Sequence, residues 1–152
     1  MMRRAKTSRS GSVMIEFTLS LSFLIPMFLG VWTFGYAFYQ YSQLENAVRT
    51  GARYASLQTY DSASTTPSSS FLSAVQKTTV YGDPSANTST ATPVVSGLTT
   101  SNVQLTVTFA SGAPSTMTVS VTNFPLKTYL GSVTLTNKPY VWFPYLGTFG
   151  PP

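Results

Sequence analysis

The sequence predicts an α+β fold, in which a long N-terminal transmembrane and amphipathic helix precedes a small head with a short helix and an antiparallel β-sheet. One reason is the segment from Phe17 to Leu44, which has no charged residue and is followed by apolar residues three and four positions apart, as in an amphipathic helix. The other is a Ser- and Thr-rich remainder, in which two segments carry apolar residues at every second position, as strands do. A helix followed by a group of strands indicates the α+β class.

Composition divides the chain into a basic leader at residues 1–11, a long helix at residues 12–57 and a head at residues 58–152. Of the 9 Lys and Arg residues, four precede residue 10, with no acid among them. An apolar run of about 20 residues can cross a bilayer, and positive charges mark its cytoplasmic side. We therefore expect a membrane span at about 14–39, a cytoplasmic leader, an extracytoplasmic head and no binding to nucleic acid.

The titratable residues argue against catalysis. The chain has no Cys and no His, which removes thiolate chemistry and the usual general base, and it has only 4 acids. A Ser or Thr nucleophile would still need an activating base, and only Asp61 and Asp83 share turn-like surroundings. No acids occur at the spacing of metal ligands. We therefore expect no enzymatic activity, no cofactor and no metal site.

The long helix has three features of its own. Pro26 removes one backbone donor, so a kink or a locally unwound turn is expected near it. Past Gln40, a stripe of small residues would let another backbone approach closely. Its members are Ala47, Gly51 and Ala55. The third feature is a group of aromatic residues that fits either a belt at the membrane surface or packing against the head. This group consists of Trp32, Tyr36, Tyr39 and Tyr41.

The head is expected to centre on a β-hairpin. Residues 103–109 and 117–122 alternate apolar and polar side chains, and the Gly- and Pro-containing segment 111–114 between them predicts the turn. Residues 133–135 and 140–143 are candidates for further strands. A short helix after Ser70, which we expect to cap it, would cover the sheet with three apolar residues. These are Phe71, Leu72 and Val75.

Two other parts of the head are less regular. Residues 59–70 and 82–93 are polar and predict loops. Residues 139–146 are rich in aromatic side chains, which indicates either core packing or a docking surface for a partner. The last segment, residues 147–152, is expected to be a tail.

The junction between leader and helix suggests processing. Gly11 precedes the apolar segment, so a cut after it would remove only the leader and leave the membrane helix on the mature protein. The cut would create an ammonium group on Ser12, one helical turn from Glu16. A carboxylate in the membrane is costly unless it is paired. The new amine, the helix dipole or the amine of a neighbouring subunit could each compensate Glu16.

At these residues the sequence resembles a known family. Gly11, four residues, then Glu16 and Phe17 match the cleavage motif of class III, type IVb-like prepilins. The wider pattern resembles the TadE-like pseudopilins of tight-adherence (Flp) pilus systems. Its more specific half is the block at residues 46–55, with a polar motif of Asn46, Arg49 and Arg53. Further matching residues are Ile15, Leu19, Leu21, Pro26, Gly30 and Gly35.

The resemblance implies a single-pass protein of the bacterial inner membrane. It implies cleavage between Gly11 and Ser12 by a dedicated prepilin peptidase, and assembly through Glu16 and Phe17 with other pilin or pseudopilin subunits on an inner-membrane platform. Pro26 and the small-residue stripe would serve helix packing in the filament. Whether the chain is a main or a minor subunit stays open. A rival interpretation is a signal-anchored module whose β-rich head recognises a surface glycan or protein.

Overall fold

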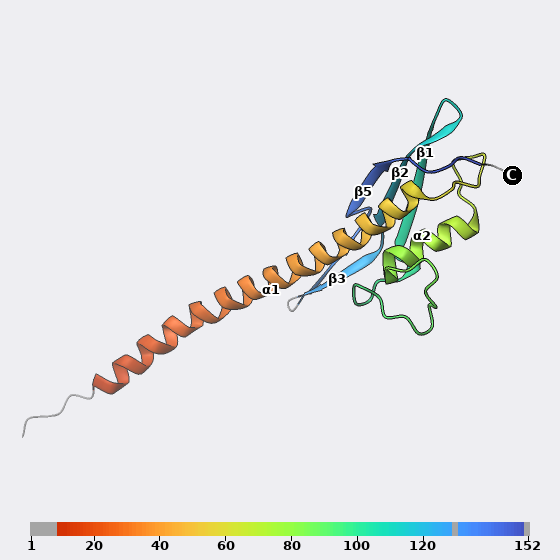
Figure 1. Ribbon diagram of the computed structural model, residues 1–152. Helices are drawn as coiled ribbons and strands as arrows, with labels where there is room; N and C mark the ends of the chain where they lie inside the picture. Colours follow the sequence, from red (N-terminus) through yellow and green to blue (C-terminus); the bar gives the residue numbers. More distant parts are fainter. Residues whose placement is uncertain (1–8, 129–130, 151–152) are drawn as a thin grey trace, which may run out of the picture.

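A computed structural model describes residues 9–128 and 131–150, and it has the predicted α+β architecture (Figure 1). Residues 1–8 of the expected leader lie outside the described residues. Helix α1 (Arg9–Leu57) forms one continuous rod that runs through Pro26. The locally unwound turn expected there is therefore absent, since the loss of one backbone donor leaves the neighbouring turns hydrogen-bonded.

The predicted hairpin forms the centre of the head. Strands β1 (Val103–Ala110) and β2 (Ala113–Val121) are antiparallel, and β5 (Tyr140–Pro144) joins the free side of β2. The turn is tighter than expected, because only Ser111 and Gly112 lie between β1 and β2. Their φ angles of 52° and 80° suit a two-residue turn whose twist matches that of the strands.

A second, smaller sheet lies beside α1. It pairs β3 (Phe124–Thr128) with β4 (Gly131–Leu135) in antiparallel register. The candidate strands at residues 133–135 and 140–143 are thus confirmed, although they belong to different sheets. Strand β3 was not expected, because its five residues include Pro125 and Lys127, which are depleted in strands.

Helix α2 (Ser69–Tyr81) begins one residue earlier than the predicted cap. Ser68 is the residue that caps it, since its side-chain oxygen accepts a hydrogen bond from the backbone N–H of Phe71 at 3.2 Å. Ser70, the expected cap, lies inside the first turn instead. Gly82 ends the helix with a φ of 78°, and the short 3-10 helix η1 (Thr100–Asn102) leads from the following loop into β1.

The core lies between the main sheet and both helices. Helix α1 lies against β2, β3 and β5, and α2 lies against α1 and β1. The fully buried residues include Leu44 and Val48 of α1 together with Met117 and Val119 of β2. The sequence predicted α2 as the cover of the sheet, and the C-terminal half of α1 supplies the rest of that layer.

The C-terminal segment belongs to the core and is not a free tail. Tyr60 and Phe149 form a β-bridge, in which the N–H of Tyr60 donates to the carbonyl of Thr148 at 3.0 Å and the N–H of Gly150 donates back at 3.2 Å. The expected tail is therefore wrong for residues 147–150, because the ring of Phe149 packs against the core. Residues 151–152 lie outside the described residues.

The aromatic segment of β5 divides between the two expected roles. Alternate side chains pack against the core, namely Val141, Phe143 and Tyr145. The side chains between them point outward, so that Tyr140 is 59% and Trp142 60% exposed. Core packing and an exposed aromatic surface therefore coexist, as the two faces of one strand.

Candidate assembly site

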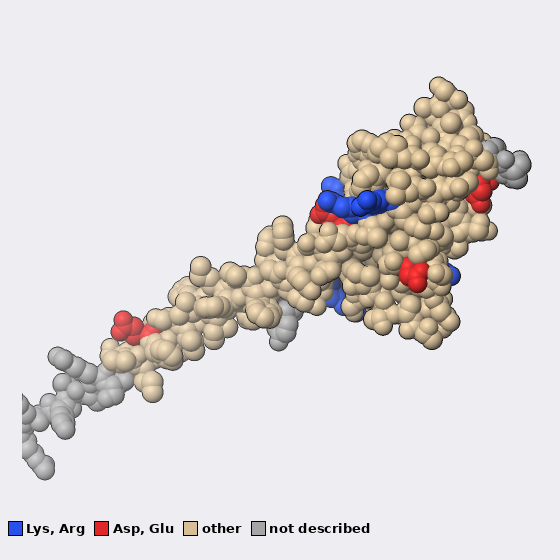
Figure 2. Space-filling model, viewed as in Figure 1, with Lys and Arg blue, Asp and Glu red and all other residues tan. Residues whose placement is uncertain are grey.

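The N-terminal half of α1 is apolar and uncovered by the rest of the described chain. Its large side chains are exposed from Val13 to Trp32, and Phe23 reaches 78%. The helix is long and apolar enough to cross a membrane. Figure 2 shows this half without Lys or Arg atoms, and with acid atoms only toward its N-terminal end. A single-pass membrane anchor fits this arrangement.

Hydroxyl groups in the apolar half bond within the helix. Thr18 donates to the carbonyl of Met14, and Ser22 donates to the carbonyl of Thr18, each at 2.8 Å. Because these donors are satisfied by the preceding turn, they cost little in hydrocarbon, where an unpaired polar group is expensive. The hydroxyls of Thr18 and Ser22 are therefore compatible with a bilayer, whereas that of Thr33 has no hydrogen-bond partner among the described residues.

The predicted cleavage site lies in the first turns of α1. Among the described residues, no atom apart from its chain neighbours and the nearby helix backbone lies within 4 Å of the position that a Cβ on Gly11 would take, and Gly11 is exposed. Ser12 and Glu16 are four residues apart and thus lie on the same side of the helix. Phe17 is 61% exposed. Among the described residues, Glu16 forms no ion pair, since the one found there joins Arg49 and Glu45.

The polar motif lies on the outer side of α1, where the helix meets the head. Asn46, Arg49 and Arg53 are exposed, and the guanidinium of Arg49 is 3.0 Å from the carboxylate of Glu45. Figure 2 shows basic atoms beside acidic ones where the helix meets the head. An exposed pair of this kind adds little to stability. These side chains are therefore free to meet another molecule.

The small-residue stripe faces the opposite way, into the head. Ala47 and Ala55 are buried, and so is Gly51. A Cβ on Gly51 would lie 3.0 Å from the Cβ of Thr79 and closer still to its hydroxyl oxygen. The backbone that approaches α1 most closely here is thus that of α2 in the same chain. The sequence did not single out Thr79, because its position depends on how the two helices pack.

The aromatic residues at the middle of α1 include some that are exposed and some that pack against the head. Trp32 is 72% and Tyr39 60% exposed, as a belt at the membrane surface requires. Tyr41 packs against the core, and Tyr36 lies between these extremes at 48% exposed. Packing against the head is thus confirmed for Tyr41, and the belt at the membrane surface stays a prediction for Trp32 and Tyr39.

Sequence reasoning missed the cluster around Tyr60, which ties the end of α1 to the C-terminal segment. The Tyr60 ring is 5.3 Å from that of Phe71 and 6.5 Å from that of Phe149, measured between centroids. The hydroxyl of Tyr145 accepts from the N–H of Tyr60 at 2.9 Å and lies 2.9 Å from the carbonyl of Gln58. Burial raises the pKa of both tyrosines above the ordinary value of 10.0.

The two acids of the head, Asp61 and Asp83, accept hydrogen bonds from nearby serine residues. Asp61 accepts a hydrogen bond from Ser68 at 2.7 Å, and Asp83 accepts two from Ser85 at 2.8 Å. The bonds from Ser85 hold the pKa of Asp83 below its ordinary range. Within residues 9–128 and 131–150, no three Asp, Glu, His or Cys side chains are grouped closely enough to hold a metal ion.

A comparison with known protein families finds a match that lies within α1. The family model described as TadE-like protein matches residues 11–53. The resemblance to TadE-like proteins is confirmed over this segment. The TadE-like segment begins at Gly11 and ends at Arg53, so it contains the junction, the apolar half of α1 and the polar motif. No curated protein and no solved structure matches the chain.

The match supports a pilus-associated, pilin-like protein. It ends within α1, and therefore every strand of the head lies outside the TadE-like segment. The head residues that complete the core, such as Thr79 and Tyr145, are found only by following the contacts of α1 into the structure.

Proposed function

We propose that this protein is a pilin-like subunit, processed after Gly11 and assembled through α1 into a pilus or secretion filament. The observation that carries the proposal is the uncovered apolar half of α1, which lies entirely within the TadE-like segment. A surface of this kind is stable either in lipid or against similar helices. A subunit that moves from the membrane into a filament uses both environments in turn.

Glu16 has the central role in this assembly. Cleavage after Gly11 leaves an ammonium group on Ser12, and a carboxylate surrounded by apolar side chains attracts such a group strongly, because little water screens the charges. The partner is the amine of the same chain or that of a neighbouring subunit. Phe17, exposed beside Glu16, packs against the neighbouring helix.

The proposal specifies partners and location. A prepilin peptidase cuts the leader on the cytoplasmic face, and an inner-membrane platform brings the subunit together with other pilins or pseudopilins. The head lies outside the cytoplasm, where the exposed polar motif and outer face of β5 are available for contacts between subunits. The protein acts by packing and does not catalyse a reaction.

Mass spectrometry tests the processing step. The intact protein, extracted from the membranes of its native host, should lack residues 1–11 and begin at Ser12. Gly11→Val should retain the leader, because a branched side chain replaces the small residue at the cut. Gly30→Val is the matched control, since Gly30 also has no atom near its missing Cβ, and it should be processed normally. Wild-type protein that still begins at Met1 or Met2 would refute processing.

A second candidate function, recognition of an uncharged ligand such as a glycan by the head, is favoured by the outer face of the main sheet. In register across β1, β2 and β5, Thr106 faces Thr118, which faces Trp142. The neighbouring row is formed by Gln104, Ser120 and Tyr140. These rows contain amide and hydroxyl groups beside exposed rings and no charge, which suits sugar faces and sugar hydroxyls.

Binding of the full chain in detergent to immobilised neutral polysaccharides tests this second function. Trp142→Ala should abolish binding, whereas Val133→Ala on β4, where the side chain is also exposed, should not. Equal retention of the two variants would remove the ligand-binding interpretation and leave the outer face as a contact between subunits.

A further inference from the structure

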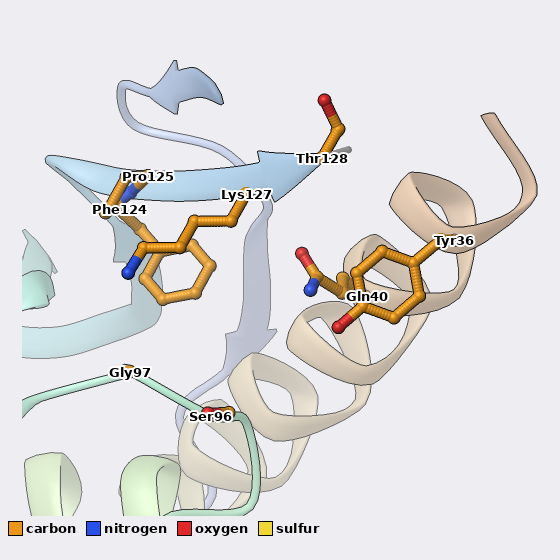
Figure 3. A pocket seen from close by; sticks show the side chains of 8 residues that line it. All are labelled: Tyr36, Gln40, Ser96, Gly97, Phe124, Pro125, Lys127 and Thr128. Atoms are coloured by element: carbon orange, nitrogen blue, oxygen red, sulfur yellow. The ribbon is translucent and has the colours of Figure 1, made fainter. Parts of the chain in front are cut away.

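A cleft of about 410 Å³ lies where α1 leaves its apolar half. One wall is α1, with Tyr36 and Gln40, and the other is β3 together with the loop that precedes η1. Figure 3 shows the side chains of Tyr36 and Gln40 directed toward β3, with Lys127 extending along the underside of that strand. All three side chains line the cleft, and in Figure 3 the ammonium of Lys127 lies beside the ring of Phe124, away from Tyr36 and Gln40.

The cleft has an unbalanced positive charge. Among the described residues that line it, Lys127 is the one charged residue and none is an acid. Among the described residues, Lys127 takes part in no ion pair. The phenol and the amide are neutral groups that can donate hydrogen bonds. An anionic group with several acceptor oxygens is the ligand that best suits these donors.

The position of the cleft along the membrane normal indicates where that anion comes from. From Phe17, next to Glu16, to Tyr36 there are about 20 residues, which as a helix span about 30 Å, the thickness of the hydrocarbon layer. If the carboxylate of Glu16 marks one boundary, Tyr36 lies at the other. The cleft then lies at the level of the lipid headgroups on the side of the head.

An apolar groove adjoins the cleft on its membrane side. It encloses about 570 Å³ between side chains of α1, and it shares Tyr36 with the cleft. The groove is lined by Phe28, Leu29, Val31, Trp32, Gly35 and Tyr36. No atom lies within 4 Å of the position of a Cβ on Gly35, so this glycine leaves room in the groove. An acyl chain fits such a surface.

We propose that the cleft and the groove together bind one anionic phospholipid from the leaflet next to the head. Its phosphate contacts the ammonium of Lys127, the other oxygens of its headgroup reach the donors of Tyr36 and Gln40, and one acyl chain lies along Gly35. The inference rests on the membrane anchorage in the proposed function but not on processing or filament formation. Such a lipid would hold the head against the membrane until the subunit is withdrawn.

Native mass spectrometry of the full chain in a mild non-ionic detergent tests the proposal. Phosphatidylglycerol and phosphatidylcholine with identical acyl chains are added in turn, and the fraction of protein that retains one lipid is measured. Wild-type protein should retain phosphatidylglycerol in preference to phosphatidylcholine. Lys127→Gln should weaken retention of phosphatidylglycerol about fivefold, which is the effect of one basic residue at a membrane surface.

Two further variants separate the cleft from general effects. Lys77→Gln, on α2 and outside the cleft, removes the same charge and should leave retention unchanged. Gly35→Leu fills the groove and should weaken retention of both lipids. Equal retention of the two lipids by wild type, or an equal loss in Lys77→Gln and Lys127→Gln, would overturn the proposal. Displacement of the lipid by inorganic phosphate alone would do the same, by showing that the site holds free phosphate.

The outcome is independent of processing and of filament formation. Intact mass reports processing, and electron microscopy of cell surfaces reports filaments, whatever the lipid result. Conversely, a chain that retains phosphatidylglycerol through Lys127 but forms no filament would support the lipid site and refute the proposed filament.

Discussion

The backbone of Gly51 in α1 packs directly against the side chain of Thr79 in α2. The hydroxyl of Thr79 donates to the carbonyl of Val75 at 2.8 Å and is fully buried, so its side chain has little room to move away from α1. The absence of a side chain on Gly51 therefore determines how closely α2 covers α1. This contact acts together with the packing of α1 against β2, β3 and β5 to hold the head on the helix.

Gly51→Ala should destabilise the head, because the added methyl group overlaps Thr79. Overpacking of this kind typically costs about 1–3 kcal/mol. Denaturant unfolding followed by circular dichroism of the protein in detergent measures the loss. Gly51→Ala combined with Thr79→Ala should recover part of it, while Gly30→Ala, at a position with open space, should cost nothing. Full stability of the single variant at Gly51 would contradict the close approach.

Ser68→Ala should shorten or loosen α2. Its side chain caps the helix and also donates to Asp61 at 2.7 Å, so the substitution removes two interactions. A lost cap costs about 1 kcal/mol. The same unfolding measurement compares it with Ser70→Ala, whose hydroxyl bonds to that of Ser68 at 2.9 Å and to Asp61 at 3.4 Å but does not cap the helix. An equal or larger effect at Ser70 would restore the original assignment of the cap.

The head should lose stability in alkaline solution. Burial raises the pKa of Tyr60 and Tyr145 in the folded state. A group with a raised folded pKa contributes its full stability below the unfolded pKa, and the contribution is lost as the pH rises above about 10 toward the folded value. Tyr145→Phe should lower stability at neutral pH, because the bond to the N–H of Tyr60 is lost, and should reduce the alkaline decline. An unchanged pH profile would show that Tyr145 does not titrate in this way.

Glu16→Ala should leave membrane insertion intact and impair assembly. The helix stays apolar without the carboxylate, whereas the amine of Ser12 loses its partner in the filament. A charged hydrogen bond of this kind corresponds to roughly a tenfold change or more in an association equilibrium. Quantitative blotting of sheared filaments against membranes measures the ratio. Glu45→Ala, which removes the exposed acid paired with Arg49, is the control, and incorporation equal to wild type in Glu16→Ala would contradict the pairing role.

The parts of the fold that could be predicted are those whose residue pattern lies within one short segment of the sequence. The spacing of apolar residues predicted α1, and the alternation in residues 103–109 and 117–122 predicted β1 and β2. The spacing of apolar residues and the turn residues are sufficient to predict such elements, because the apolar or polar type of each side chain indicates whether it is buried or exposed. The end of α1 at Leu57 was also predicted, because Ser, Thr and Pro dominate the residues that follow.

The parts that were missed depend on contacts between distant residues. The sequence of β3 is a poor strand, yet it is held beside α1 by Phe124 and Leu126, both buried. Phe149 looked like part of a tail, because its partners around Tyr60 are far away in sequence. The cleft at Lys127 was missed for the same reason, since α1 and β3 contribute to it from opposite ends of the chain. At the junction the pattern is local, and its residues could be named from the sequence.

The bridge between Tyr60 and Phe149 also bears on the order of biogenesis. The N–H of Tyr60 is bonded to the hydroxyl of a residue 85 positions later, so the end of α1 has no complete core until that part of the chain has been made. The apolar half of α1 emerges first from the ribosome and can enter the membrane long before then. In the proposed topology, the chain would therefore be anchored while its head is still open, and the head would close only after the C-terminal residues have crossed to the same side.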